Sequence, residues 1–491
     1  MSSRKRSMMN KMATTRTIRV LLVVLEISLF AAAQNDPNSE RTGPAPALGQ
    51  NAPVLNPDSP PISSLDEPGL EMRSDARSFV SAGLSVSETA DSNANNQGVD
   101  SPPGRGFGRQ SMSSVTHLLG ALDVQRFYAK TDLFAEYLGG GAFYTNSTHS
   151  ARQLHALGVM GVTRWRTGRV TLRDSFSYLP EGSFSVGAFG GVPGLGIATG
   201  GGGSGLAGGG LPGSHFFGNG QFGSVGLTPR ISNSVLLDVV QSLTPRSAFT
   251  VAAGFSNAHF FDNTEVLINS DREMVQAGYS YMLGRRDQVA GVYGFQQFRF
   301  PQDAGGQIDA HTVNFRWGHT ISGKMNLIVG AGPQYLVIED PILGTVSRWS
   351  ANGRAVIRYK FTRTSVAAAY EKFTSAGSGF FAGSDVQAVR WSASRPLRRT
   401  WEVYLDLGYA HNRRLQTQLL TGLPGNTFNH GFARVLLRKH LGREYSAFAA
   451  YRFNDLGFDS SFCDSGACNR ISQRHMATIG VEWHPRPSRI D

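Results

Sequence analysis

The sequence has only two cysteines among 491 residues, and outside the first 33 residues it has no apolar run of 18 or more. A transmembrane helix needs about 20 predominantly apolar residues, so the missing runs exclude one. The cysteines, Cys463 and Cys468, lie five positions apart. In an exported chain such a close pair predicts a disulfide, whereas a metal site would need more ligands than Cys463, Asp464 and Cys468 provide.

Recognisable catalytic motifs are also missing. The chain contains no nucleophile elbow and no paired metal histidines. Its glycine-rich stretches lack the Lys-Ser/Thr pair that completes a phosphate-binding loop. We therefore expect no enzyme, no cofactor and no metal ion, although catalytic groups dispersed along the sequence would escape this test.

The N-terminus has the order of a secretory signal peptide. Six basic residues within 1–19 precede the apolar run 20–30, and Ala31-Ala32-Ala33 supplies small residues before Gln34. We expect cleavage after Ala33. Removal of residues 1–33 takes away six basic side chains and Glu26, which lowers the formal net charge from +11 to +6. A basic exported chain does not indicate a nucleic-acid partner.

Residues 34–76 are polar and proline-rich, which predicts a disordered periplasmic segment. The rest of the chain repeats one unit: two long alternating segments joined by a tight basic turn. The turns centre near Lys130, Thr167, Pro245, Arg285, Gly323, Arg363, Arg398 and Gly442, spaced 35 to 44 residues apart except for one gap of 78. Longer polar or glycine-rich connections lie between them. Short turns on one side and long loops on the other are typical of a membrane-spanning antiparallel barrel.

A repeat of about 40 residues is also typical of a β-propeller, but a propeller blade holds four short strands with Gly-His and Trp-Asp signatures. Here each repeat holds two long strands and no such signature. The expected strands are 77–88, 115–128, 132–144, 151–165, 169–179, 231–243, 247–260, 271–284, 287–300, 308–321, 325–337, 347–361, 364–374, 385–395, 400–410, 430–440, 445–456 and 471–484. Because the number of strands is even, the N-terminal and the C-terminal end of the chain both lie on the periplasmic side.

Residues on the two faces of these strands differ in polarity. In 400–410, Trp401 and Leu405 share an apolar face, while Glu402 and Asp406 share the other. A soluble sandwich would show the same alternation with its faces reversed, so periodicity alone leaves both open. The aromatic residues favour the membrane reading because they gather near the turns, as in the girdles of barrels: Phe127, Tyr128, Trp165, Tyr281, Trp317, Phe361, Trp391, Trp401, Tyr445 and Trp483.

In these features the chain resembles the broad class of Gram-negative outer-membrane β-barrel, porin-like proteins. The resemblance covers residues 77–484 and includes a last strand that ends in an aromatic residue, Thr478 to Trp483. It implies an all-β fold: a transmembrane antiparallel up-and-down barrel of about 18 strands (16 possible), with short periplasmic turns and long extracellular loops. It also implies contact with outer-membrane lipid and with the barrel-insertion machinery. The chain departs from the class by continuing through a tail, 485–491.

The predicted function is an outer-membrane channel for small polar solutes, anions among them, since barrels of 16 to 18 strands enclose an aqueous lumen. Export of a polysaccharide or another macromolecule, and a surface adhesion or structural barrel, stay open as alternatives, and the oligomeric state is not predicted. The glycine-rich insert 180–229 is either a flexible surface loop or a segment that folds inward and narrows the pore.

The predicted pore lining consists of the charged residues on the polar faces of the strands. The basic members are Arg316, Arg354, Arg358, Lys360, Arg390, Arg434, Arg438, Arg452 and Arg474, and the acidic ones are Glu136, Glu402, Asp406 and Glu482. Two roles are open for them: free charge that selects solutes, or cross-strand pairs that stiffen the wall.

Overall fold

The computed structural model describes residues 78–93, 112–145, 151–179, 230–261, 268–301, 306–340, 344–377, 379, 381–415, 426–459, 471–483, 485 and 488–489. All of them belong to one compact unit, residues 51–491. The predicted signal peptide 1–33, the predicted disordered segment 34–76, the insert 180–229 and both cysteines lie outside the described residues. Within the described ranges, no helix is long and apolar enough to cross a membrane.

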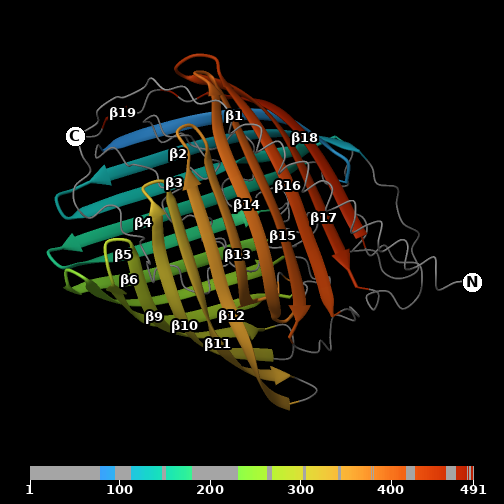
Figure 1. Ribbon diagram of the computed structural model, residues 1–491. Helices are drawn as coiled ribbons and strands as arrows, with labels where there is room; N and C mark the ends of the chain where they lie inside the picture. The colour runs from blue at the N-terminus through green and yellow to red at the C-terminus, as the bar shows by residue number, and fades with distance from the viewer. Residues whose placement is uncertain are drawn as a thin grey trace, which may run out of the picture. The chain divides into compact units, whose positions relative to one another are not determined.

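The described residues form one antiparallel sheet of long strands that closes on itself (Figure 1). The strands are β1 (Phe79–Asp91), β2 (Ser113–Phe127), β3 (Thr131–Tyr144), β4 (Ala151–Trp165), β5 (Gly168–Leu179), β6 (Arg230–Thr244), β7 (Ser247–Phe260), β8 (Ser270–Met282), β9 (Asp287–Phe300), β10 (Gly306–Ser322), β11 (Met325–Asp340), β12 (Gly344–Lys360), β13 (Ser365–Ser375), β14 (Ser384–Arg398), β15 (Trp401–Arg414), β16 (Thr427–His440), β17 (Tyr445–Phe458) and β18 (Ile471–Trp483).

Closure occurs between the first and the last long strand. Leu84 of β1 lies opposite Gly120 of β2 on one side and opposite Trp483 of β18 on the other. Every other pairing among β1–β18 joins neighbours in sequence. The predicted 18-stranded up-and-down barrel is therefore confirmed.

A short nineteenth strand, β19 (Ser488–Arg489), lies within what the sequence predicts as a plain tail. Its residues pair with Val80 and Phe79 at the start of β1. The pairing of β18 with β1 begins only at Leu84, so the first residues of β1 would otherwise present an unpaired edge. The tail covers part of that edge.

The strand bounds agree with the predicted ones within four residues at every end, and one connection is shorter than expected. A long loop is expected between 337 and 347, but β11 and β12 continue pairing until Asp340 lies opposite Gly344, leaving residues 341–343 as the connection. Gly344 has a φ of +73°, a backbone conformation that favours glycine and allows this tight turn. The expectation of a long loop is wrong here because the alternating pattern of the strands continues through Ile338 and Val346, which lie opposite each other.

Side-chain exposure shows which face of the sheet is outside. In β10, Phe315 is 69% exposed, whereas its neighbours Asn314 and Arg316 are buried. Each of the 18 long strands exposes at least one large apolar side chain: Leu84, Leu118, Leu133, Leu157, Leu172, Leu237, Val251, Val275, Tyr293, Phe315, Val329, Trp349, Tyr370, Val389, Tyr409, Val435, Tyr451 and Ile479. A soluble barrel would hide these residues and expose the polar ones. The wall therefore has the surface of a membrane-spanning barrel.

The two ends of the barrel differ in their connections. Eight connections of two to four residues lie at one end, here called the turn end: 128–130, 166–167, 245–246, 283–286, 323–324, 361–364, 399–400 and 441–444. Backbone hydrogen bonds close four of them, among them those from Tyr128 N to Thr131 O (2.8 Å) and from Phe361 N to Thr364 O (2.7 Å). The opposite end, here called the loop end, carries the other connections.

Candidate pore lining

Ten of the thirteen residues predicted to line the pore occupy inward positions of their strands. Arg316, Arg354, Arg390, Arg434, Arg438, Arg452, Arg474, Glu402, Asp406 and Glu482 all have the parity of the buried side chains in β10, β12 and β14–β18. Arg358 and Lys360 of β12 and Glu136 of β3 lie in described strands, but their side chains lie outside the described part. Most of the set therefore gathers on one half of the inner wall.

Six of these arginines form a band that we call the arginine belt: Arg316, Arg354, Arg390, Arg434, Arg452 and Arg474. Its centre is a row across β15, β16 and β17, in which Asp406 lies opposite Arg434 and Arg434 lies opposite Arg452. Arg390 of β14 binds the same carboxylate with two donors, Nε to Oδ1 at 2.9 Å and Nη2 to Oδ2 at 2.6 Å. Asp406 therefore lies near three arginines: it is hydrogen-bonded to Arg390, lies opposite Arg434, and is separated by one strand from Arg452 in the same row.

The belt continues across β10–β13. Arg354 lies opposite Glu371, and their Nε and Oε1 atoms are 3.2 Å apart. On its other side, Gly330 separates Arg354 from Arg316 in the same row. A Cβ on Gly330 would lie 2.9 Å from Cγ of Arg316, so the glycine leaves the space in which that arginine lies.

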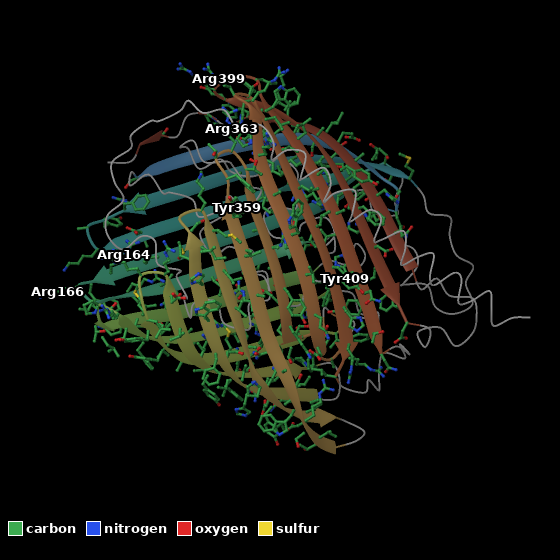
Figure 2. The ribbon with its side chains drawn as sticks, viewed as in Figure 1. Arg164, Arg166, Tyr359, Arg363, Arg399 and Tyr409 are labelled. Atoms are coloured by element: carbon green, nitrogen blue, oxygen red, sulfur yellow. The ribbon has the colours of Figure 1, made fainter. Side chains whose placement is uncertain are left out.

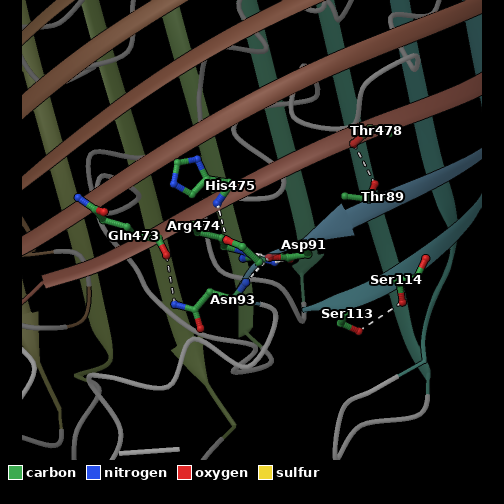
Figure 3. Close-up of polar contacts among 10 residues, drawn as sticks. Thr89, Asp91, Asn93, Ser113, Ser114, Gln473, Arg474, His475 and Thr478 are labelled. Carbon is green, nitrogen blue, oxygen red and sulfur yellow. Dashed lines mark hydrogen bonds and ion pairs between the residues drawn. The ribbon is translucent and has the colours of Figure 1, made fainter. Parts of the chain in front are cut away.

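At the seam of the barrel, Arg474 of β18 binds Asp91 of β1 (Figure 3). Its Nε lies 3.0 and 2.9 Å from the two carboxylate oxygens, and Nη2 also contacts Oδ2. Both side chains are almost fully buried, 4% and 1% exposed. Thr89 and Thr478 share a hydroxyl hydrogen bond of 2.9 Å one row away. Sequence reasoning missed Asp91 because the predicted first strand ends at residue 88.

A second charged group lies nearer the turn end of β15–β18. Arg438 Nη2 and Glu482 Oε1 are 3.6 Å apart, and both side chains are buried. Tyr404 donates its hydroxyl to Glu402 Oε2 at 2.6 Å, and His440 Nε2 lies 3.6 Å from the other oxygen of Glu402. Several of the residues predicted to line the pore thus form pairs between strands, as Arg438 does with Glu482 and Glu402 does with His440.

The described residues of the connection between β13 and β14, 376–377, 379 and 381–383, lie against the inner wall; we call them the inward loop. Gly377, Gly379 and Gly383 have φ values of +88°, +85° and +82°, which allow its tight course. The loop joins two other loop-end segments through its carbonyls: Ile268 N donates to Gly379 O (2.8 Å) and Leu415 N donates to Gly383 O (3.1 Å). At its base, the hydroxyls of Ser375 and Ser384 are 2.7 Å apart.

Apolar packing holds the inward loop against the inner wall. Its Ala382 belongs to a buried group contributed mainly by β9–β11: Ile268, Phe298, Phe300, Ile308, Ala310, Leu336, Ile338 and Ala382. Phe381 packs on Phe428 of β16, with ring centroids 5.2 Å apart. The sequence left two roles open for the insert 180–229, a flexible surface loop or a segment that narrows the pore, and this insert lies outside the described residues. The missed signal was the glycine spacing at 377, 379 and 383 around two phenylalanines.

The fold and this inner wall define a membrane-spanning antiparallel β-barrel. No family model and no curated protein matches the chain. Among solved structures, the chain is similar to the outer membrane protein opdK from Pseudomonas aeruginosa (11% identity, TM-score 0.38, covering 82% of this chain and 98% of that one). It is also similar to OccK9 (OpdG) from Pseudomonas aeruginosa (12%, 0.40, 84% and 98%) and to OccAB3 from Acinetobacter baumannii (10%, 0.38, 82% and 98%). At these scores the likeness carries no functional argument.

Proposed function

We propose that the protein is an outer-membrane channel that passes small polar solutes and prefers anions. The observation that supports it is the arginine belt on the inner wall of a closed 18-stranded barrel. Barrels of 16 to 18 strands enclose an aqueous lumen, whereas barrels of about 8 strands are filled by side chains. The belt holds six arginines, and three of them, Arg474, Arg354 and Arg390, form ion pairs with Asp91, Glu371 and Asp406.

A band of guanidinium groups on one half of the inner wall raises the local concentration of anions. The low-dielectric wall behind the charges focuses their field into the lumen. Mobile salt weakens this field, because the Debye length falls from about 10 Å at 0.1 M to about 3 Å at 1 M. Anion preference should therefore be strongest in dilute salt.

The position of the inward loop favours a channel for small solutes over the alternative, a conduit for macromolecule export. The loop occupies part of the loop-end mouth and is tied to two further connections and to β16. A segment held against the wall in this way leaves less of the mouth to a large polymer than to a small solute.

The proposal is tested by reversal potentials of the full-length protein in planar bilayers under a salt gradient. The wild type should favour chloride over potassium, and the triple variant Arg390→Gln, Arg434→Gln, Arg452→Gln should lose that preference while still inserting. A matched control removes three bases at outward positions near the loop end, Arg299→Gln, Lys372→Gln and Arg413→Gln, and should leave the preference unchanged. Unchanged selectivity in the belt variant would assign those arginines to wall stiffening, and absence of conductance in the wild type would reject the channel.

A further inference from the structure

Each of the eight turns at the turn end carries exposed positive charge. Figure 2 shows Arg166, Arg363 and Arg399 at three of them. The ten exposed bases at or beside the turns are Lys130, Arg166, Arg246, Arg285, Arg286, Lys324, Arg363, Arg398, Arg399 and Arg443. Two carboxylates lie at or beside the same turns, Glu444 and Asp287. The turn end is therefore a ring of strong positive charge.

The same turns also expose an apolar side chain. One to three residues before the first base of each turn stands a large hydrophobic residue that is 40–60% exposed: Tyr128, Trp165, Leu243, Leu283, Ile321, Phe361, Leu397 and Leu441. All eight continue the outward parity of the strand that leads into the turn. Every turn thus places an apolar group on the lipid side and a base immediately beyond it.

Neighbouring aromatic contacts place this ring at a membrane boundary. The indole Nε1 of Trp165 donates to Gln241 at 3.0 Å, and the indole Nε1 of Trp317 donates to Asp287 at 3.0 Å. Lys439 lies over the ring of Trp401, 5.2 Å from its centroid. Rings with one apolar and one polar side are typical of the headgroup region.

From these observations we propose that the turn end binds the anionic headgroups of phospholipids in the leaflet that surrounds it, such as phosphatidylglycerol. The bases are complementary to headgroup phosphates, and positive side chains next to an anionic leaflet are attracted to it. The apolar residue beside each base distinguishes a lipid from a soluble acidic polymer, because a polymer would leave that residue in water. This inference does not depend on the channel function.

The test uses the full-length protein in phosphatidylcholine vesicles that contain spin-labelled phosphatidylglycerol or spin-labelled phosphatidylcholine. Electron paramagnetic resonance measures the motionally restricted fraction of each label at the protein surface. Phosphatidylglycerol should associate several-fold more strongly at about 0.1 M salt and approach equality at about 1 M, where the Debye length is about 3 Å. Changing the ten turn bases to glutamine should remove the preference.

The loop-end control, Arg299→Gln, Lys372→Gln and Arg413→Gln, should keep the lipid preference, because its outward bases lie at the other end of the barrel. Folding of each variant is checked by heat-dependent mobility in gels. If the ten-residue variant does not fold, two variants that each change the bases of four turns replace it, and each should lose part of the preference. Equal association of both labels with the wild type, or an undiminished preference in the folded turn variants, would overturn the proposal. Loss of preference in the loop-end control alone would also overturn it.

Discussion

At the scale of single residues, small side chains on the inner wall decide where large ones lie. A Cβ on Gly408 would come within 2.2 Å of Cε1 of Phe432, so the phenylalanine lies flat over this glycine. The guanidinium of Arg390 in turn lies over the Phe432 ring, 5.7 Å from its centroid. Glycine, aromatic ring and arginine therefore form a stack that directs Arg390 toward Asp406.

The buried seam pair gives the first prediction. Asp91→Asn removes the carboxylate but leaves the buried Arg474, so the free energy of unfolding should fall by about 3–5 kcal/mol. The measurement is urea unfolding in detergent micelles, followed by tryptophan fluorescence. Glu273→Gln is the matched control, because Glu273 and Arg299 form a pair that is about half exposed and is expected to contribute at most about 1 kcal/mol. Equal losses in the two variants would contradict a special role of the seam pair.

At the scale of elements, strands were predictable and the inward loop was not. Alternation is a local signal, so Arg390, Arg434 and Arg452 could be assigned to the polar face from sequence alone. The partner Asp91 could not, since it meets Arg474 only through the pairing of the first strand with the last. The inward loop depends on Phe298 and Ile308, which come from strands far earlier in the chain, and no local pattern encodes such a contact.

Release of the inward loop is the second prediction. Gly383→Val places a branched side chain at a φ of +82° and within reach of Ile308, where a Cβ would already lie 2.2 Å from Cδ1. The strain should cost about 1–3 kcal/mol and displace the loop from the wall, so single-channel conductance should rise. Gly442→Ala at the turn end is the control, since nothing lies within 4 Å of its Cβ position. Conductance equal to wild type in Gly383→Val would show that the loop does not limit passage.

At the scale of the whole molecule, the two ends of the barrel differ in both chain connection and charge. The turn end has short connections rich in exposed bases. Outward positions near the loop end carry both signs: carboxylates such as Glu273, Asp309 and Asp455, and the bases Arg299, Lys372 and Arg413. This polarity gives the barrel a defined direction in a membrane.

Orientation is the third prediction. With an even number of strands, the turn end should face the periplasm and the insert 180–229 the outside of the cell. In a background with Cys463 and Cys468 changed to serine, Ser214→Cys in the insert should react with a membrane-impermeant maleimide on intact cells. Arg246→Cys at a turn should react only after the outer membrane is permeabilised. The reverse labelling pattern would show that the barrel has the opposite orientation in the membrane.

The seam between β1 and β18 also determines the order in which the molecule can form. All other pairings of long strands are between sequence neighbours, and each can be made as soon as its own hairpin exists. The pairing of Thr89 with Thr478 spans 389 residues, so it must await the last strand. Because non-local contacts are the slow ones to make, completion of the barrel is one late event that follows many fast local ones. Until β18 arrives, the curved sheet retains two free edges, and a chain that ends before residue 471 has no means of joining them.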